Sequence, residues 1–230
     1  MPVITFANTK GGAGKTTAAL ILATELARQG SRVTILDADP QHWISHWHEI
    51  SGKIANIDVI SSVSLASIQG HINENRAKTD YFIIDLAGAR NTLMASAIGL
   101  SDHVMIPIQG CAMDAKGGAQ VLELLCHLRE KAGIHIAHSV ALTRVNSLVT
   151  TRALQVVKQL LAQRSVHVLE TPIVERSAFR DIFDCGGTLQ TMDATRVSNL
   201  DKARDNARAF ADEVRRLVPA RALATLRRAA

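Results

Sequence analysis

VITFANTKGGAGKTT, residues 3–17, decides the fold of this chain. Residues 3–6 are apolar and β-favouring, and an Ala- and Leu-rich helical pattern begins at Thr16. Between them lies K-G-G-A-G-K-T-T, residues 10–17. A strand, a glycine-rich turn and a helix in this order predict a loop that binds the phosphates of a nucleotide. The alternative is a glycine-rich turn that binds nothing.

A polyphosphate can be surrounded by backbone N–H groups only where no Cβ atom intervenes and φ can become positive, which glycine permits. The N-terminus of the following helix adds unpaired N–H groups and a positive dipole end. Lys15 is placed to reach the β- and γ-phosphates, and the Thr16 hydroxyl to bind Mg²⁺. The predicted phosphate site consists of Gly11, Gly12, Ala13, Gly14, Lys15, Thr16 and Thr17.

The composition is that of an ordinary globular domain: 230 residues, of which 47% are hydrophobic and 20% charged. No apolar run approaches the roughly 18 residues of a membrane span, and the first strand begins too early to leave room for a signal peptide. We therefore expect a cytoplasmic protein. Cys111, Cys126 and Cys185 are too widely spaced for a disulfide framework or a zinc motif.

Strand and helix patterns alternate along the chain, which predicts an α/β fold with a mostly parallel, twisted sheet and helices on both faces, a three-layer sandwich. Further strands are expected at 32–36, 57–60, 80–85, 103–108, 134–142 and 166–169. Helices are expected at 16–29, 65–77, 114–132 and 151–163, with more beyond 175. One domain, 1–218, would be followed by a basic tail, 219–230.

Acidic side chains end two of these strands. Asp37 and Asp39 follow the strand at 32–36, and Asp85 ends the strand at 80–85. Carboxyl ends of parallel strands meet at the ligand crevice, so we expect these acids beside the phosphate loop. Asp85 can hold a Mg²⁺-bound water there. Gly88 would let the next turn approach the phosphates.

Two motifs, K-G-G-A-G-K-T-T and D-A-D-P-Q at 37–41, resemble those of the ParA/MinD family of ATPases with a deviant Walker A loop. The common template has glycine where this chain has Thr9, and the resemblance instead points to Lys10. In that family the early lysine reaches across a nucleotide-sandwich dimer to the partner's phosphates. The resemblance implies that Asp37 lies on the metal side and that Asp39 orients the attacking water.

The same resemblance suggests contacts to the base. T-R-V-N at 143–146 is similar to T-R-x-N in MinD-type proteins, which makes Arg144 and Asn146 candidates. The turn at 171–174, which contains Pro172, borders the base in relatives.

Net charge is +5, and residues 201–230 carry eight Lys or Arg against four Asp or Glu. In the resembling family a basic surface of the ATP-bound dimer binds DNA through its phosphates without reading sequence. The candidate residues are Arg176, Arg180, Lys202, Arg204 and Arg208. A solvated charged face is the simpler alternative.

The resemblance implies a slow ATPase that uses Mg²⁺, converts ATP and water to ADP and phosphate, and forms an ATP-dependent homodimer. It would bind double-stranded DNA non-specifically, associate with the nucleoid, and segregate or position plasmid or chromosomal cargo. A ParB-like or other cargo-binding partner with a basic N-terminus would stimulate it. Alternatives are a MinD-like protein at a membrane surface, a ParA-like protein of conjugal or T-DNA transfer, and a metal-cluster carrier of the Mrp/NifH branch, against which the lack of a C-x-x-C pair argues. The tail at 217–230 has no aromatic anchor, so membrane binding is not favoured.

His42 and His46 would share one face of a helix, as zinc ligands do. No third ligand follows at a typical spacing, and Trp43 and Trp47 lie among them. We expect a helix that packs both tryptophans on the core.

Overall fold

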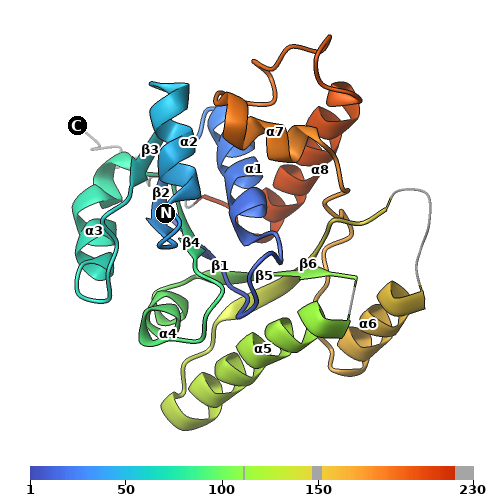
Figure 1. Cartoon of the computed structure of the whole chain (residues 1–230). Helices are drawn as coiled ribbons and strands as arrows, with labels where there is room; N and C mark the ends of the chain where they lie inside the picture. Colours follow the sequence, from blue (N-terminus) through green and yellow to red (C-terminus); the bar gives the residue numbers. More distant parts are fainter. Residues whose placement is uncertain (111, 147–151, 221–230) are drawn as a thin grey trace, which may run out of the picture.

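A computed structural model describes residues 1–110, 112–146 and 152–220 of the chain (Figure 1). Its centre is a six-stranded sheet in the order β3-β2-β4-β1-β5-β6, and every strand pair is parallel. The strands are β1 Val3–Phe6, β2 Val33–Ala38, β3 Ile57–Ile60, β4 Tyr81–Leu86, β5 His103–Gln109 and β6 Ala137–Thr143. All six carboxyl ends therefore lie at one edge of the sheet.

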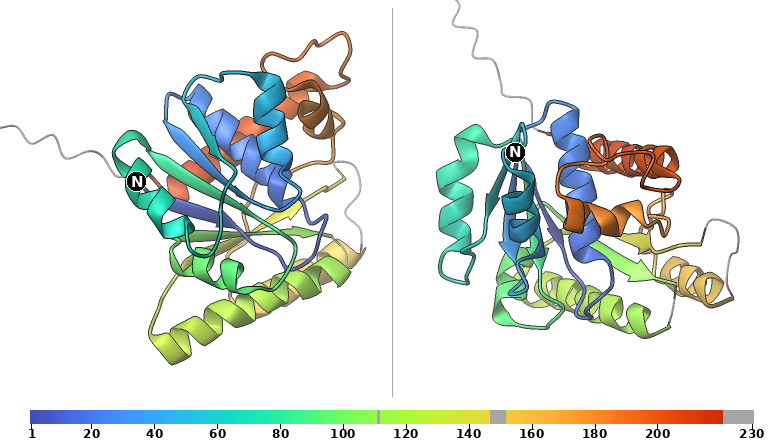
Figure 2. Two further views of the ribbon diagram at one scale, coloured as in Figure 1. Left: turned by 60° about the vertical axis from the view of Figure 1, so that its left-hand side comes forward. Right: turned by 45° about the horizontal axis from the view of Figure 1, so that its top comes forward.

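Helices cover both faces of the sheet (Figure 2). One face carries α1 Lys15–Arg28, α2 Trp43–Ser51, α7 Ala178–Cys185 and α8 Leu200–Leu217. The other carries α3 Ile68–Asn75, α4 Thr92–Gly99, α5 Ala112–Ala132 and α6 Arg152–Gln163, with a short 3₁₀ turn, η1 Arg76–Lys78, after α3. This arrangement confirms the predicted three-layer α/β sandwich.

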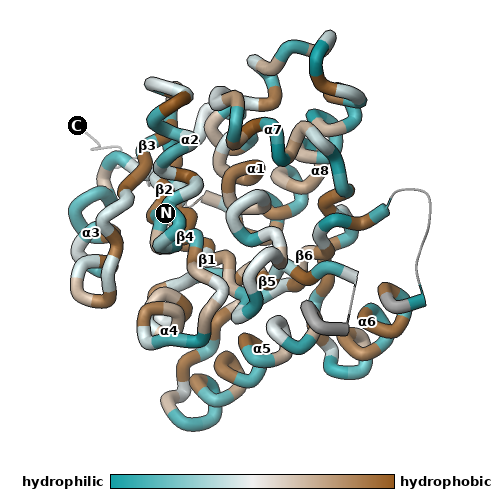
Figure 3. The backbone as a smooth tube through the Cα atoms, viewed as in Figure 1, coloured by the Kyte–Doolittle hydropathy of each residue, from teal (hydrophilic) through white to brown (hydrophobic). Residues whose placement is uncertain are grey.

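The strands are buried on both faces, which explains their continuous apolar character. On β4, Phe82 and Ile84 pack in the core under α3 to α6, whereas Ile83 between them packs under α1 and α8. Hydrophobic residues accordingly gather along the strands and on the inward sides of the helices (Figure 3). Because successive side chains of each strand point to opposite faces, one sheet contributes to two hydrophobic cores.

Several predicted elements differ from the observed ones. The strand expected at 166–169 is wrong: it is reduced to a single bridge between Val140 and Val168. Pro172 follows closely and has no N–H with which to continue a ladder. The helix expected at 65–77 begins only at Ile68, and the structure adds α4, whose N-cap Asn91 accepts a 2.8 Å hydrogen bond from the Met94 N–H.

The two tryptophans of α2 differ in burial. Trp47 is fully buried, as expected, but the prediction for Trp43 is wrong, since its side chain is 48% exposed. A helix of nine residues presents one narrow face to the core, and Trp43, its first residue, lies off that face. Among the described residues no group of three or more His, Cys, Asp or Glu side chains could hold a metal ion, so the His42/His46 alternative gains no support.

Outside the core, Cys126 and Cys185 are free and exposed, and Cys111 lies outside the described residues. Every helix in the described ranges is too short or too polar to cross a membrane. The tail begins at Pro219, and the Ala220 N–H donates a 2.8 Å hydrogen bond to the Tyr81 hydroxyl. Its remaining residues, 221–230, on which the membrane hypothesis depends, lie outside the described part of the chain.

A histidine network fastens the segment 166–169 to the sheet at the end away from the phosphate loop. Ser139 on β6 is hydrogen-bonded to His103 Nε2 at 3.0 Å and to His167 Nδ1 at 2.9 Å. Burial, with repulsion from His138 and His167, lowers the pKa of His103 to about 4. His103 is therefore neutral in the folded protein at neutral pH.

This network predicts a loss of stability in mild acid. An unfolded histidine titrates near 6.5, so between there and about 4 the unfolded chain binds a proton that folded His103 does not. The free energy of unfolding keeps its full value above pH 6.5 and decreases by on the order of 3 kcal/mol as the pH falls to about 4. Urea unfolding as a function of pH should show this slope, and His103→Gln should flatten it. The exposed His135→Gln is the control; an unchanged slope in His103→Gln would contradict the assignment.

Candidate nucleotide site

A cleft of about 720 Å³ opens at the carboxyl edge of the sheet. The predicted loop, the acid segment after β2 and the turn after β4 form its floor. From the predicted set, the cleft is lined by Gly11, Gly12, Gly14, Lys15, Thr16, Thr17, Asp39 and Arg144. Its position at the strand ends is where α/β sheets bind ligands.

The loop adopts a conformation that needs glycine. Gly12 and Gly14 have φ of +78° and +90°, and Gly14 is the N-cap of α1. The Thr143 hydroxyl donates to the Ala13 carbonyl at 2.8 Å, and Gln109 Nε2 donates to the Gly12 carbonyl. Protein donors thus hold two loop carbonyls. A Cβ atom built on Gly11 or Gly12 would meet nothing within 4 Å, so space for an anion lies beside them.

Lys15 is only 4% exposed although it carries an ammonium group. Its Nζ donates a 3.1 Å hydrogen bond to the Lys10 carbonyl. Burial lowers the pKa of Lys15, while the carboxylates of Asp85 and Asp39 act to raise it. Among the described residues, the hydrogen bond of Lys15 Nζ goes to a carbonyl and not to a carboxylate, so a phosphate group at the N-terminus of α1 would supply an anionic partner.

The three predicted acids converge as expected but differ in environment. Asp37 and Asp85 are paired in the β2–β4 ladder and fully buried. Asp37 Oδ2 accepts from the N–H and the hydroxyl of Ser45 at 2.8 and 2.6 Å, so this acid also caps α2, a role that the sequence did not reveal. Asp39 lies partly exposed in the cleft, where its Oδ1 accepts from the Gln41 N–H at 2.9 Å.

Buried oxygen atoms without partners make this site suited to a cation. Neither oxygen of Asp85 nor Oδ1 of Asp37 has a hydrogen-bond partner within the described chain. Burial raises the pKa of Asp85 to about 8, an effect that Thr16 and Lys15 offset only in part. Carboxylate and hydroxyl oxygens are the ligands that Mg²⁺ prefers. Asp37, Asp85 and Thr16 therefore fit the predicted metal site.

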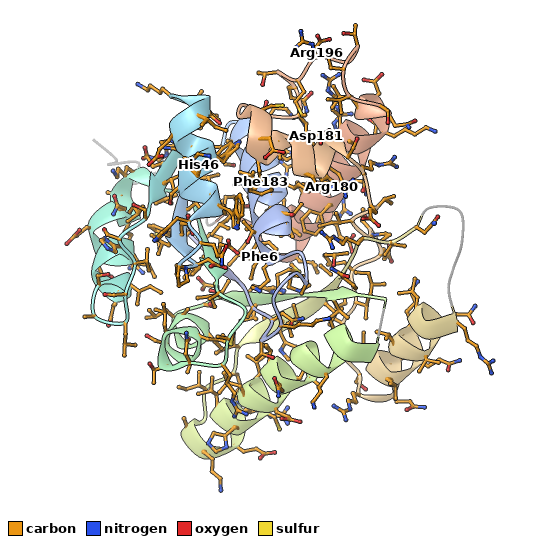
Figure 4. All side chains as sticks on the ribbon, in the orientation of Figure 1. Phe6, His46, Arg180, Asp181, Phe183 and Arg196 are labelled. Atoms are coloured by element: carbon orange, nitrogen blue, oxygen red, sulfur yellow. The ribbon has the colours of Figure 1, made fainter. Side chains whose placement is uncertain are left out.

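Helix α7 forms a wall of the cleft that sequence reasoning missed. Phe179, Arg180, Phe183 and Asp184 line the cleft from this helix, and Trp43 lines it from α2. Figure 4 shows Arg180 and Phe183 on α7, whereas Arg196 lies in the segment between α7 and α8. The sequence indicated helices beyond residue 175, but no sequence signal places one of them over a loop that lies near the other end of the chain.

The candidates for base contact are dispersed. Arg144, with φ of +49°, lines the cleft and a smaller hollow of about 40 Å³ beside it. Asn146 is exposed and is not among the residues that line either space. The Pro172 carbonyl accepts from Asn206 Nδ2 at 2.8 Å, so it fastens α8 to the turn.

The candidates for DNA contact fall into three settings. Arg180 lines the cleft and Arg176 the smaller hollow, so both lie near the nucleotide site. Arg204 is half-buried against the protein: its Nε donates to the Leu189 carbonyl at 2.8 Å and its Nη1 pairs with the exposed Asp201 at 3.0 Å. Lys202 and Arg208 are exposed on α8. All five assignments to DNA stay predictions.

Together, the parallel sheet, the glycine loop with its buried lysine and the facing acids define a P-loop ATPase of the ParA/MinD type. The chain is 37% identical over 211 residues to Protein ParA of Rhizobium radiobacter, covering 92% of this chain and 95% of that one. It is 28% identical over 184 residues to Protein virC1 of the same organism, covering 78% and 79%. Its fold matches the Cyanothece McdA(D38A)–ATP complex with a TM-score of 0.73 at 19% identity, covering 93% and 96%.

The particular family follows from a match along nearly the whole chain. Residues 1–222 match the family described as VirC1 protein, and the chain belongs to it.

The buried acid gives a prediction about stability. An unfolded Asp titrates near 3.8 and Asp85 near 8, so wild-type stability falls as pH rises between these values. Without nucleotide or metal, Asp85→Asn should exceed wild type by at least about 1 kcal/mol near pH 8, and the difference should shrink toward pH 4. Chemical denaturation at the two pH values measures it. If Asp85→Asn were less stable than wild type near pH 8, the buried Asp85 carboxylate would not destabilise the fold, and the prediction would be wrong.

Proposed function

We propose that this chain is an ATP-driven molecular switch: Mg²⁺-ATP joins two copies in a sandwich dimer, and the dimer binds DNA without sequence preference. The observation that carries the proposal is that two lysines of one loop lie in different places. Lys15 is buried in the cleft, whereas Lys10 is not among the residues that line it. A cation beside the phosphate loop but outside its own cleft is suited to serve the cleft of a second subunit.

The chemistry assigned to each residue follows from its setting. Loop N–H groups and the Lys15 ammonium hold the β- and γ-phosphates, and Asp37, Asp85 and Thr16 hold Mg²⁺ with its water shell. The metal ion supplies positive charge that offsets charge developing on the phosphates. Asp39, the acid exposed in the cleft, accepts a hydrogen bond from the attacking water and orients it toward the γ-phosphate.

Hydrolysis is expected to be slow. A phosphoryl-transfer site depends on a complete set of positive groups around the transferred phosphate, and a single subunit supplies only part of it. The second copy contributes Lys10, and a ParB-like or other cargo-binding partner with a basic N-terminus stimulates turnover further. Loss of the γ-phosphate then removes the anion that holds the dimer together.

DNA binding is assigned to the C-terminal helices. Lys202 and Arg208 on α8 are exposed, and each dimer would present two such faces. Several added phosphate contacts raise affinity steeply and make it sensitive to salt. The protein would thereby associate with the nucleoid only while ATP is bound, and would carry plasmid or chromosomal cargo through its partner.

A second candidate has a specific observation in its favour. The chain belongs to the VirC1 family, and we keep a role in conjugal or T-DNA transfer, the alternative drawn from the sequence resemblance, as the second candidate. The two roles share the ATP-dependent dimer and differ in the partner and its DNA site.

The switch is tested by gel shift of a random-sequence duplex with ATP, with ADP and with Lys10→Ala plus ATP. We expect a shift with wild type and ATP that is at least about tenfold weaker in the other two cases, because the dimer is much weaker in each. Equal binding in all three would overturn the proposal.

Lys202→Ala and Arg208→Ala should each reduce the salt slope of DNA binding by about two, because each variant removes one phosphate contact, with the counterion that it displaces, from both subunits of the dimer.

Asp39→Ala tests the catalytic assignment. Because Asp39 is proposed to orient water rather than to hold the nucleotide, this variant should lose ATP turnover by at least about 100-fold and still form ATP-dependent dimers. Phosphate release and sedimentation measure the two properties. Turnover at the wild-type rate would mean that another residue orients the water.

A further inference from the structure

The backbone of Lys10 is held by a buried amide. Asn8 is fully buried, and its Oδ1 accepts a 2.9 Å hydrogen bond from the Lys10 N–H. Its Nδ2 donates to the Pro107 carbonyl of β5 at 2.7 Å. Asn8 therefore joins the start of the phosphate loop to the neighbouring strand, and both ends of its amide are used. The orientation of the amide is fixed by this pairing of one donor with one acceptor.

Two glycines from distant parts of the chain approach the same residue closely. A Cβ atom built on Gly117 of α5 would overlap Asn8 Oδ1 and lie 3.1 Å from both N and Cβ of Lys10. A Cβ atom on Gly88, in the turn after β4, would lie 2.5 Å from the Gly11 nitrogen and 2.7 Å from the Lys10 carbonyl carbon. We call Asn8, Gly88 and Gly117 the Lys10 clasp.

Gly117 is otherwise unfavourable in its position. It lies inside the 21-residue helix α5, where a glycine costs about 1 kcal/mol relative to alanine. Close packing against the loop explains the residue, because any side chain would displace Asn8 or Lys10. Thr9 adds a further tie to α5 through a 2.5 Å hydrogen bond between its hydroxyl and Gln120 Oε1.

Hydrogen bonds fix the backbone on both sides of the Lys10 Cα. Lys15 Nζ donates to the Lys10 carbonyl at 3.1 Å, and the Lys10 N–H donates to Asn8 Oδ1 at 2.9 Å. Asn8 is not among the residues that line the cleft, so its bond to Lys10 does not depend on contact with a nucleotide.

From this geometry we infer that Asn8, supported by Gly117, is a positioning residue that directs Lys10 toward the second subunit. The inference rests on the proposed function, in which Lys10 serves the cleft of a partner copy. Asn8 touches neither phosphate nor water; it acts by fixing the backbone from which the Lys10 side chain projects.

The inference is tested with Asn8→Ala in the full-length protein. Affinity for a fluorescent ATP analogue at low protein concentration should change little, since the cleft lining is intact. The dissociation constant of the ATP-dependent dimer, measured by sedimentation, should rise by at least about tenfold, because the backbone that carries Lys10 would no longer be fixed and would have to be ordered when the dimer forms. Thr34→Val is the matched control: it removes a buried hydroxyl, hydrogen-bonded to Thr79 at 2.7 Å, from the same sheet.

A second variant tests the Lys10 clasp by changing its residue on α5. Gly117→Ala should weaken the dimer as Asn8→Ala does, whereas Gly70→Ala, at a helix glycine with room for a Cβ atom, should not. In a Lys10→Ala background, Asn8→Ala should weaken the dimer no further, because the side chain that it positions is gone.

The outcomes separate this inference from the function on which it rests. If Lys10→Ala itself leaves the dimer unchanged, the proposed function fails. If Lys10→Ala weakens the dimer while Asn8→Ala retains it at the wild-type dissociation constant, only the positioning role is overturned. An equal weakening in Asn8→Ala and Thr34→Val, or additive effects with Lys10→Ala, would show a general effect on stability and would also overturn it.

Discussion

Ionisable side chains that are buried without their full set of hydrogen bonds, at one edge of a parallel sheet, are the constraint on which the rest of the structure depends. Lys15, Asp37 and Asp85 are buried there, and three of the four carboxylate oxygens have no hydrogen-bond partner within the described residues. Burial of charge without compensation is costly, so such an arrangement is expected only where a ligand completes it. A nucleotide phosphate beside Lys15 and a cation beside the two acids would neutralise the edge.

Hydrogen bonds connect the elements around this edge, so a ligand bound beside the acids can affect helices on the other side of the cleft. Asp37 caps α2 through Ser45, and the end of α2 is fastened to α7, since Trp47 Nε1 donates to the Gly187 carbonyl at 2.9 Å. The Gly187 N–H in turn donates to the Ser51 hydroxyl at 2.7 Å. The acid segment and the α7 wall are thus parts of one packed unit. A change at Asp37 or Asp39 can therefore reach the far side of the cleft through direct contacts.

Much of the fold and the centre of the site could be predicted because both rest on local patterns. Buried parallel strands read as continuous apolar runs, and the loop, its lysine and the acids Asp37, Asp39 and Asp85 follow strand ends whose meeting at one edge is a rule of topology. The α7 wall could not be predicted, because its place over the loop depends on packing between segments far apart in the sequence. Arg204 shows the same limit: its charge suggested a surface role, whereas tertiary structure ties it to the Leu189 carbonyl. Trp43 was misplaced because helical periodicity alone does not say which residues of a short helix reach the core.

Lys10 lies beside the loop and outside the cleft lining, and in the proposed dimer it would serve the site of the second subunit. The most direct measurement is the mass of the wild-type protein in solution, by sedimentation or light scattering, with and without Mg²⁺ and a non-hydrolysable ATP analogue. We predict the 24.8 kDa monomer without nucleotide and about twice that mass with the analogue. The same single-subunit mass in both conditions, at protein concentrations where the analogue is fully bound, would contradict the sandwich dimer.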